Sequence, residues 1–310
     1  MAFSYANPTD VMTIDEARAA EVIPEIWKPM LQEKKFDNLT ILPFVTDLSS
    51  YLSAGGDTVH VPEIFTNTFT VQTQSTEGAG IVDATKLPVD VTLSVDTHKY
   101  IAWLLGDKTV AQILRAYNLN EKYAAESRKL LLKEVEDSLF ALWSSLTTNT
   151  AVGDTTTTLS DYEIRVAINT MEGKFMLEEC VFFIHPTVFW LQLSGITKYY
   201  TDDTSRMNLI NNAGFGAKGT QNYKGRLYNI PVFTSSRVVG ALQTYRNLLL
   251  HPDALGVAFQ TIGGGMVRVQ SDYLLQNLAN LTVCDIIYGV GVLRADAGVV
   301  VNSNTTAVTS

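Results

Sequence analysis

A segment of about 29 residues, at positions 119–147, carries one continuous apolar stripe at helical spacing. Asn118 and Glu121 stand where an N-cap pair would open a helix. The stripe consists of Leu131, Val135, Leu139, Leu142 and Leu146. At about 1.5 Å per residue, this segment predicts a helix of about 43 Å, more than twice the average globular length. We therefore expect this helix to be the structural backbone of the fold.

A second pattern, at residues 58–105, alternates apolar and polar side chains with a period of two, which is typical of half-buried strands. The two alternating halves enclose a polar segment, residues 74–88, with few apolar side chains. These features predict one long two-stranded hairpin with a wide polar tip. Because an isolated two-stranded ribbon is only marginally stable in water, we expect this hairpin to pack on something else.

The N-terminal region has the pattern of an arm and not of a compact domain. Thr13 and Glu16 form a capping-box signature, and an apolar helical stripe continues to about Phe36. Pro24 and Pro29 interrupt this stripe, so two short helices or one kinked helix are expected.

After the long helix, shorter helices and strands alternate, which makes the fold class α+β. A Thr-rich loop at 147–160 precedes an expected helix at 161–172, a buried strand at 180–184 and a helix at 186–193. An Asn- and Gly-rich loop is expected at 195–223. The strands expected beyond it are residues 226–234, 247–250, 255–260, 266–270 and 281–293.

Composition excludes several classes of protein. With 46% hydrophobic and 18% charged residues, the chain is not a disordered protein, a coiled-coil rod or a collagen-like chain. No apolar run approaches about 18 residues, and the first ten residues lack the pattern of a signal peptide. Two cysteines, Cys180 and Cys284, cannot form a disulfide framework or a cysteine-rich metal site. We expect a soluble protein of a reducing compartment with no membrane partner.

The net charge of -9 lies entirely in the first third of the chain. Residues 1–98 contain 14 acidic and 5 basic side chains, whereas residues 99–310 contain 18 of each. This asymmetry indicates that the first third meets something other than its own core. It argues against a non-specific nucleic-acid binder, which needs clustered Lys and Arg to displace counterions.

Motifs for catalysis or ligand binding are nearly absent. The sequence has no metalloprotease helix motif, nucleophile elbow, dinucleotide fingerprint or zinc-ligand spacing. Residues 214–220 superficially resemble a phosphate-binding loop but lack its spacing, so we expect a flexible surface loop there. Three glycines at 263–265 fit a hairpin turn better than a ligand cradle.

The titratable residues are scattered along the chain and select no catalytic set. The histidines are His60, His98, His185 and His251. His185 and His251 each precede a proline at the end of an apolar strand, and we expect both to be strand-end residues. The carboxylates expected on solvated faces are Glu134, Glu136, Glu178 and Glu179. Cys180 has the surroundings of an inert buried thiol. We expect no enzymatic activity, no catalytic, cofactor-binding or metal-binding residue, and no cofactor.

The order of these elements resembles that of the major capsid proteins of tailed bacteriophages, which have the Hong Kong 97-type fold. Gly55-Gly56-Asp57-Thr58-Val59-His60-Val61-Pro62 is similar to the family's segment at the start of an extended loop, and residues 89–96 to its returning strand. Phe183-Ile184-His185-Pro186 resembles a strand-to-helix step in the family's axial domain. Gly225-Arg226-Leu227-Tyr228-Asn229-Ile230-Pro231-Val232 resembles a further family segment, with Asn229 in place of the usual glycine.

The resemblance implies a domain organisation and two elements that serve neighbouring subunits. Residues 1–50 would form the N-terminal arm, 51–105 the extended loop and the start of the peripheral domain, and 106–159 the peripheral domain with its spine helix. Residues 160–245 would form the axial domain, and 246–310 the return strands of both domains. Some family members are covalently cross-linked between Lys and Asn; Lys86, near the loop tip, is a candidate that we expect not to react.

The leading hypothesis is a structural protein that self-assembles into an icosahedral shell around double-stranded DNA. Its implied partners are itself, in hexamers and pentamers, packaged DNA bound without sequence preference, and scaffold, portal and decoration proteins. Its implied location is the virion capsid, assembled in the bacterial host cytoplasm. Two alternatives remain: an encapsulin-type nanocompartment shell, which encloses protein cargo, and a soluble α+β enzyme with no recognisable linear motif.

Overall fold

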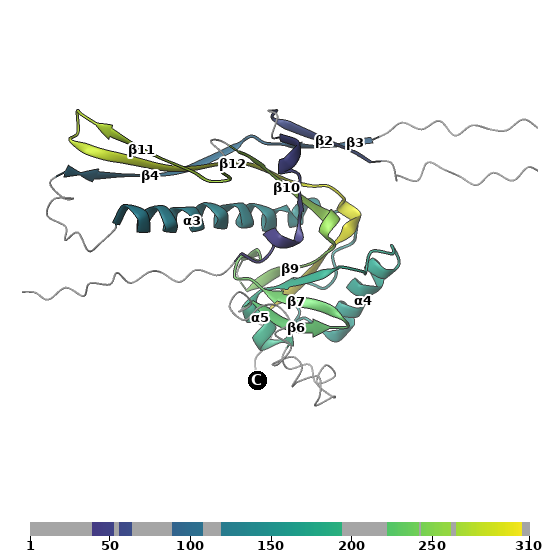
Figure 1. Ribbon diagram of the computed structural model, residues 1–310. Helices are drawn as coiled ribbons and strands as arrows, with labels where there is room; N and C mark the ends of the chain where they lie inside the picture. The colour runs from purple at the N-terminus through teal and green to yellow at the C-terminus, as the bar shows by residue number, and fades with distance from the viewer. Residues whose placement is uncertain are drawn as a thin grey trace, which may run out of the picture.

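The computed structural model describes residues 39–52, 56–63, 89–107, 119–193, 222–241, 243–261 and 265–305. These residues form an elongated layer, in which a sheet lies along a long helix, and a more rounded part built on a second sheet (Figure 1). The arm helices expected before residue 37, the hairpin tip with Lys86, and the loop at 214–220 lie outside the described residues. Of the three glycines at 263–265, only Gly265 is described.

The long helix is confirmed, although its α-helical part is shorter than expected. Helix α3 spans Leu119–Ala141, and a 3₁₀ turn, η4, continues it over Leu142–Ser145. Its 23 residues make it about 34 Å long. Leu131, Val135 and Leu139 of the expected stripe are buried, in a core that α3 shares with strands of both sheets. The helix therefore connects the two parts of the molecule through its C-terminal half.

Replacing Leu139 with alanine will lower the free energy of unfolding of the isolated subunit by about 2–5 kcal/mol. Leu139 is fully buried, so the substitution removes transfer energy and leaves a cavity. Urea denaturation followed by circular dichroism measures the loss. Lys129, exposed on the same helix, provides the control, and its alanine variant will change stability by less than about 0.5 kcal/mol. A Leu139→Ala subunit with an unchanged denaturation midpoint would contradict the assignment of the stripe.

The sheet of the elongated layer is organised around one long strand, β12 (Ala279–Val292). Strand β4 (Thr97–Gly106) pairs with one side of β12, antiparallel. The other side is shared between β11 (Arg268–Leu274) and β10 (Leu255–Gln260), and the short β1 (Thr46–Asp47) pairs with β10. Ile101 and Trp103 of β4 pack toward the α3 core, whereas Tyr100 and Leu104 of the same strand are exposed. The elongated sheet thus has one face on α3 and one face outward.

The predicted long hairpin is confirmed only at its base. Strands β2 (Thr58–Glu63) and β3 (Val89–Ser94) pair antiparallel as expected. The continuation of the return strand to residue 105 is wrong, because the chain leaves the ribbon after β3 and pairs with β12 as β4. Val59 and Leu93 also pack with Leu48 and Ala258, so the base of the ribbon has an apolar anchor within its own chain.

The second sheet has the strand order β13-β9-β5-β7-β6. These strands are β13 (Gly298–Asn304), β9 (Thr244–Leu250), β5 (Val181–Ile184), β7 (Ile230–Thr234) and β6 (Tyr223–Leu227), and the short β8 (Gly240–Ala241) pairs with β9. Two helices pack with this sheet: α4 (Asp161–Glu172) and α5 (Pro186–Leu191). Two short 3₁₀ helices, η7 (Pro252–Ala254) and η8 (Ala295–Ala297), connect strands of the two sheets. Two others, η2 (Leu42–Phe44) and η3 (Ser49–Leu52), precede and follow β1.

The single strand expected at 226–234 is wrong, because two antiparallel strands occupy these residues. The chain reverses at Tyr228 and Asn229, whose φ angles of 49° and 67° are those of a tight hairpin turn. Asparagine tolerates this left-handed region better than most residues, which explains Asn229 at the position where the resemblance has glycine.

Helix α4 has well-defined signals at both ends. Ser160 and Glu163 form a capping box at its start. At its end, the N–H of Met176 donates to the carbonyl of Met171 at 3.1 Å, and the N–H of Phe175 donates to that of Glu172 at 2.9 Å. This is a Schellman motif, whose left-handed position glycine usually occupies. At the end of α4, Phe175 occupies this position with a φ of 58°. The left-handed conformation costs a residue with a side chain about 1–2 kcal/mol of conformational free energy.

Candidate functional site

The carboxylate of Glu136, on α3, connects segments that lie far apart in the sequence. It accepts hydrogen bonds from the backbone N–H groups of Thr40, Ile41 at 2.9 Å and Leu42 at 3.4 Å. Its second oxygen pairs with the guanidinium of Arg237, in the loop between β7 and β8. We call these five residues the Glu136 anchor. The anchor fixes the chain at the point where it emerges from residues 1–38.

The anchor is buried, and this corrects the expectation that Glu136 lies on a solvated face. The side chains of Glu136 and Arg237 are 0% and 4% exposed. Burial raises the pKa of the Glu136 carboxyl, and the charge of Arg237 together with the three N–H donors opposes that rise. A signal existed in the sequence: Leu132, Leu139 and Phe140 lie four residues before, three after and four after Glu136. These spacings place the carboxylate on an apolar face.

A second ionic cluster holds the strands of the elongated sheet together. The side chain of Asp285, on β12, is only 4% exposed, and it accepts two hydrogen bonds from Arg268 on β11, at 2.9 and 2.6 Å. His98 Nε2, on β4, lies 3.0 Å from the same carboxylate. Arg268 holds the pKa of Asp285 below the ordinary aspartate value. Glu134, expected to be solvated, is half-exposed and bonds Lys99 of β4 at 2.5 Å, which links the sheet to α3.

We expect Asp285 to make the stability of the subunit pH-dependent at acid pH. Since its folded pKa is below the ordinary value of 3.8, its contribution is complete above that value and is lost as the pH falls through the folded pKa. Urea denaturation at steps between neutral pH and about pH 2 measures this loss. In the Asp285→Asn variant, this part of the fall in unfolding free energy with decreasing pH will be absent. If the unfolding free energy of the variant depends on pH as that of the parent does, other carboxylates produce the acid sensitivity.

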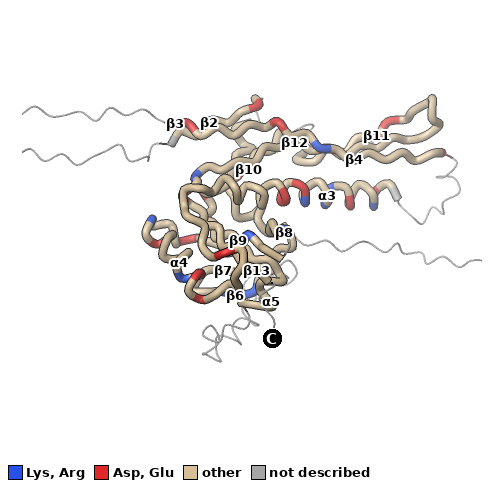
Figure 2. The backbone as a smooth tube through the Cα atoms, turned by 180° about the vertical axis from the view of Figure 1, so that it is seen from behind, with Lys and Arg blue, Asp and Glu red and all other residues tan. Residues whose placement is uncertain are grey.

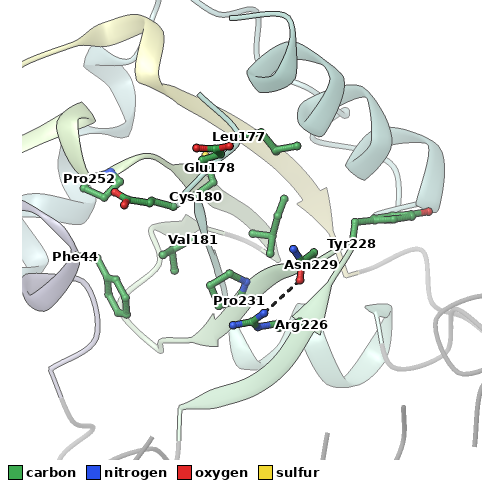
Figure 3. A pocket seen from close by; sticks show the side chains of 12 residues that line it. Phe44, Leu177, Glu178, Cys180, Val181, Arg226, Tyr228, Asn229, Pro231 and Pro252 are labelled. Carbon is green, nitrogen blue, oxygen red and sulfur yellow. Dashed lines mark hydrogen bonds between the residues drawn. The ribbon is translucent and has the colours of Figure 1, made fainter. Parts of the chain in front are cut away.

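A hollow lies where the second sheet meets η2 and η7 (Figure 3). It has a volume of about 480 Å³, and its lining is mostly apolar. The two polar side chains that Figure 3 joins, Arg226 and Asn229, bond each other at 3.2 Å. Cys180 also lines the hollow, but burial raises the pKa of its thiol to about 12, which makes it a poor nucleophile, as expected. The lining therefore supplies no paired nucleophile and base among the described residues.

The four histidines lie on separate elements and form no shared site. His185 and His251 follow β5 and β9, so both are strand-end residues as expected, and each ring also caps the helix that begins after it. The ring of His185 stacks on Tyr245 with centroids 4.1 Å apart. His60 is exposed beside Asp90, at 3.7 Å, and His98 belongs to the Asp285 cluster. In the described part of the chain, no group of three His, Cys, Asp or Glu side chains could hold a metal ion.

Exposed apolar side chains are the strongest surface feature of the described residues. Those with more than half of their area exposed are Tyr51, Tyr100, Tyr162, Phe175, Trp190, Leu191, Leu275 and Leu278. They lie on η3, on β4, on α4 and in the turn after it, on α5, and in the β11–β12 hairpin. Where such side chains gather, as Trp190 and Leu191 do on α5 and Leu275 and Leu278 do in the β11–β12 hairpin, they are suited to contact with other macromolecules. Where the structure describes helices, none is long and apolar enough to cross a membrane.

Comparison with known proteins identifies the fold. No protein-family model matches this sequence, and no curated protein is similar to it in sequence. A chain from Mycobacterium phage Che8 has a TM-score of 0.68 at 20% identity, over 90% of this chain and 96% of that one. The capsid structure of Cyanophage P-SCSP1u has a TM-score of 0.67 at 12% identity, over 96% of this chain and 98% of that one. The mature capsid of bacteriophage PhiM1 has a TM-score of 0.65 at 13% identity, over 98% of this chain and 100% of that one. The chain thus has the phage major capsid protein fold that the order of its elements predicted.

Proposed function

We propose that this chain is a structural protein that self-assembles into the icosahedral shell of a tailed phage, enclosing double-stranded DNA. The observation that carries the proposal is the extent of the fold match, which covers at least nine-tenths of this chain and of each of the three capsid-type structures. The exposed apolar side chains support it, because a shell subunit buries such groups against its neighbours. The location that follows is the virion capsid, with assembly in the host bacterial cytoplasm.

We propose the following roles for the parts of the molecule. Helix α3 is the spine of a peripheral domain that includes the elongated sheet, and the second sheet with α4 and α5 belongs to an axial domain around the capsomer centre. The part of the arm before residue 39 and the loop carried by the β2–β3 ribbon reach neighbouring subunits in hexamers and pentamers, whereas residues 40–48 pack on their own chain. Scaffold, portal and decoration proteins are further proposed partners. The ribbon supports this division because it lies at the end of the elongated layer opposite the β11–β12 hairpin (Figure 1).

Assembly of the purified chain tests the proposal directly. We expect closed shells of uniform diameter in electron micrographs, with a matching fast-sedimenting species. Shells purified from a phage-producing host and treated with nuclease will retain protected DNA. Shells that contain a protein cargo instead would indicate the nanocompartment function, and a chain that stays monomeric under all assembly conditions would contradict the shell function.

We expect the shell protein to bind DNA weakly and without sequence preference. Figure 2 shows acidic and basic residues together along α3, with no continuous basic stripe. Residues 99–310 are neutral in sum, which leaves local basic patches but no massed charge. Binding measured by fluorescence anisotropy at stepped salt concentrations will therefore fall only modestly with salt. A steep dependence, equivalent to about 6–10 phosphate contacts, would contradict this prediction.

A further inference from the structure

The turn that follows α4 presents an aromatic ring to solvent at a conformational cost. Phe175 is 97% exposed, and its φ of 58° lies in the left-handed region that favours glycine. An isolated subunit gains nothing from either property, since a glycine would close the same Schellman motif without strain and without an exposed ring. The position therefore indicates a contact that the isolated chain does not make.

Among the described residues, no side chain fills the hollow beside this turn. Leu177, two residues after Phe175, is one of its lining residues. The apolar lining also includes Phe44, Val181, Pro231 and Pro252 (Figure 3). Because Phe175 of the same chain is almost fully exposed, that ring does not fill it. With a volume of about 480 Å³, the hollow has room for an aromatic side chain and its backbone.

The charges beside the ring and around the hollow are complementary. Lys174 precedes Phe175 in the turn, whereas the exposed carboxylates of Glu178 and Glu179 line the hollow. Arg226, which also lines it, offers a guanidinium that attracts the face of an incoming ring. A turn with one cation and one aromatic side chain therefore matches the hollow in shape and in charge.

We propose that Phe175 of one subunit inserts into this hollow on a neighbouring copy of the same chain, with Lys174 facing the neighbour's Glu178 and Glu179. The inference rests on the proposed self-assembly and names one contact that makes it specific. The strained backbone at Phe175 is then explained, because the left-handed turn holds the ring outward for the neighbour.

A glycine substitution separates the effect on assembly from the effect on folding. In Phe175→Gly the isolated subunit will be at least as stable to heat as the parent, because glycine adopts the turn freely. The subunit concentration required for shell formation will rise about tenfold or more, since a buried aromatic ring is lost at each contact. Phe175→Leu, which keeps an apolar side chain, will recover part of this loss. Gln243→Gly is the matched control: Gln243 has a φ of 71° and is exposed, but it does not line the hollow.

Cysteine cross-linking locates the contact. In a Phe175→Cys, Pro231→Cys variant, oxidation of assembled shells will produce covalently linked subunits, and either single variant will produce far fewer. Because Cys180 lines the same hollow, all of these variants are made in a Cys180→Ala background, and the thiol of Cys284 is buried on β12 and will not compete.

The outcomes distinguish this contact from the proposed function. If the parent chain forms no shells, the proposed function fails. The function stands and the contact is overturned if two results are found together. Phe175→Gly shells form at the same subunit concentration as parent shells, and the Phe175→Cys, Pro231→Cys variant gives no cross-links. Loss of a separate bound protein from otherwise normal Phe175→Gly shells would also overturn it.

Discussion

Replacing Glu136 with alanine will lower the free energy of unfolding of the subunit by about 3–5 kcal/mol. The substitution leaves the buried guanidinium of Arg237 with only the more distant carboxylate of Asp137, at 3.7 Å, and it removes the acceptor of three backbone N–H groups at residues 40–42. Both consequences are costly because neither the cation nor the N–H groups can reach water without local unfolding. Urea denaturation of the isolated subunit measures the loss, and proteolysis near residue 40 will accelerate.

Glu134 provides the matched control for this prediction. It lies two residues earlier on α3 and also pairs with a cation, Lys99, but its side chain is 47% exposed. Because a half-exposed ion pair contributes little, Glu134→Ala will cost less than about 1 kcal/mol. Replacing Glu136 and Arg237 together with methionine will recover much of the loss, since no charge is then left buried. Equal destabilisation by Glu134→Ala and Glu136→Ala would show that the anchor has no special role.

Replacing residues 75–86 with a short Gly-Ser turn will leave a soluble, folded subunit and abolish closed shells. These residues have few apolar side chains to hold them on their own chain. The base of the ribbon, in contrast, stays anchored through Val59 and Leu93. Because a shell repeats each contact in many copies, a modest loss per contact is multiplied over the particle. Circular dichroism will be near that of the parent, and sedimentation with electron microscopy will show no shells.

A length-matched Gly-Ser replacement of the same residues separates the length of the loop from its sequence. If that variant assembles and the short one does not, assembly requires the length of the loop and not its sequence. Intact shells from the short variant would show that the loop is not an assembly element. An aggregated short variant would show that the tip packs within its own subunit, and the physical argument for the loop would be lost.

Elements with strong local signals were predictable from the sequence. Helix α4 begins and ends at the expected residues because a capping box opens it and an apolar stripe runs along it. The stripe of the long helix was correct at its first three positions, which lie on α3, because burial along a helix follows a period of 3.6 residues. His185 and His251 were placed correctly at strand ends because the proline after each one stops a strand.

Features that depend on tertiary partners were not predictable in this way. The change of partner between β3 and β4 leaves no trace in the sequence, since the period of two continues across it. The turn at Tyr228 was missed because tyrosine is not a usual residue at positive φ. Glu136 was assigned to solvent because a carboxylate on a helix is usually exposed, and its partner Arg237 lies 101 residues away.

The central position of β12 has a mechanical consequence for a shell under internal pressure. Its ten consecutive pairs with β4 run along one side, and β11 and β10 follow each other along the opposite side. A tension applied along the strands loads these hydrogen bonds in shear, all at the same time, whereas a force across the sheet breaks them one after another. We therefore expect the elongated layer to be stiff lengthwise and weak to peeling. Under overload, a wall of such subunits will yield first by detachment of β11, whose seven pairs with β12 are the only strand pairing it makes in the described residues.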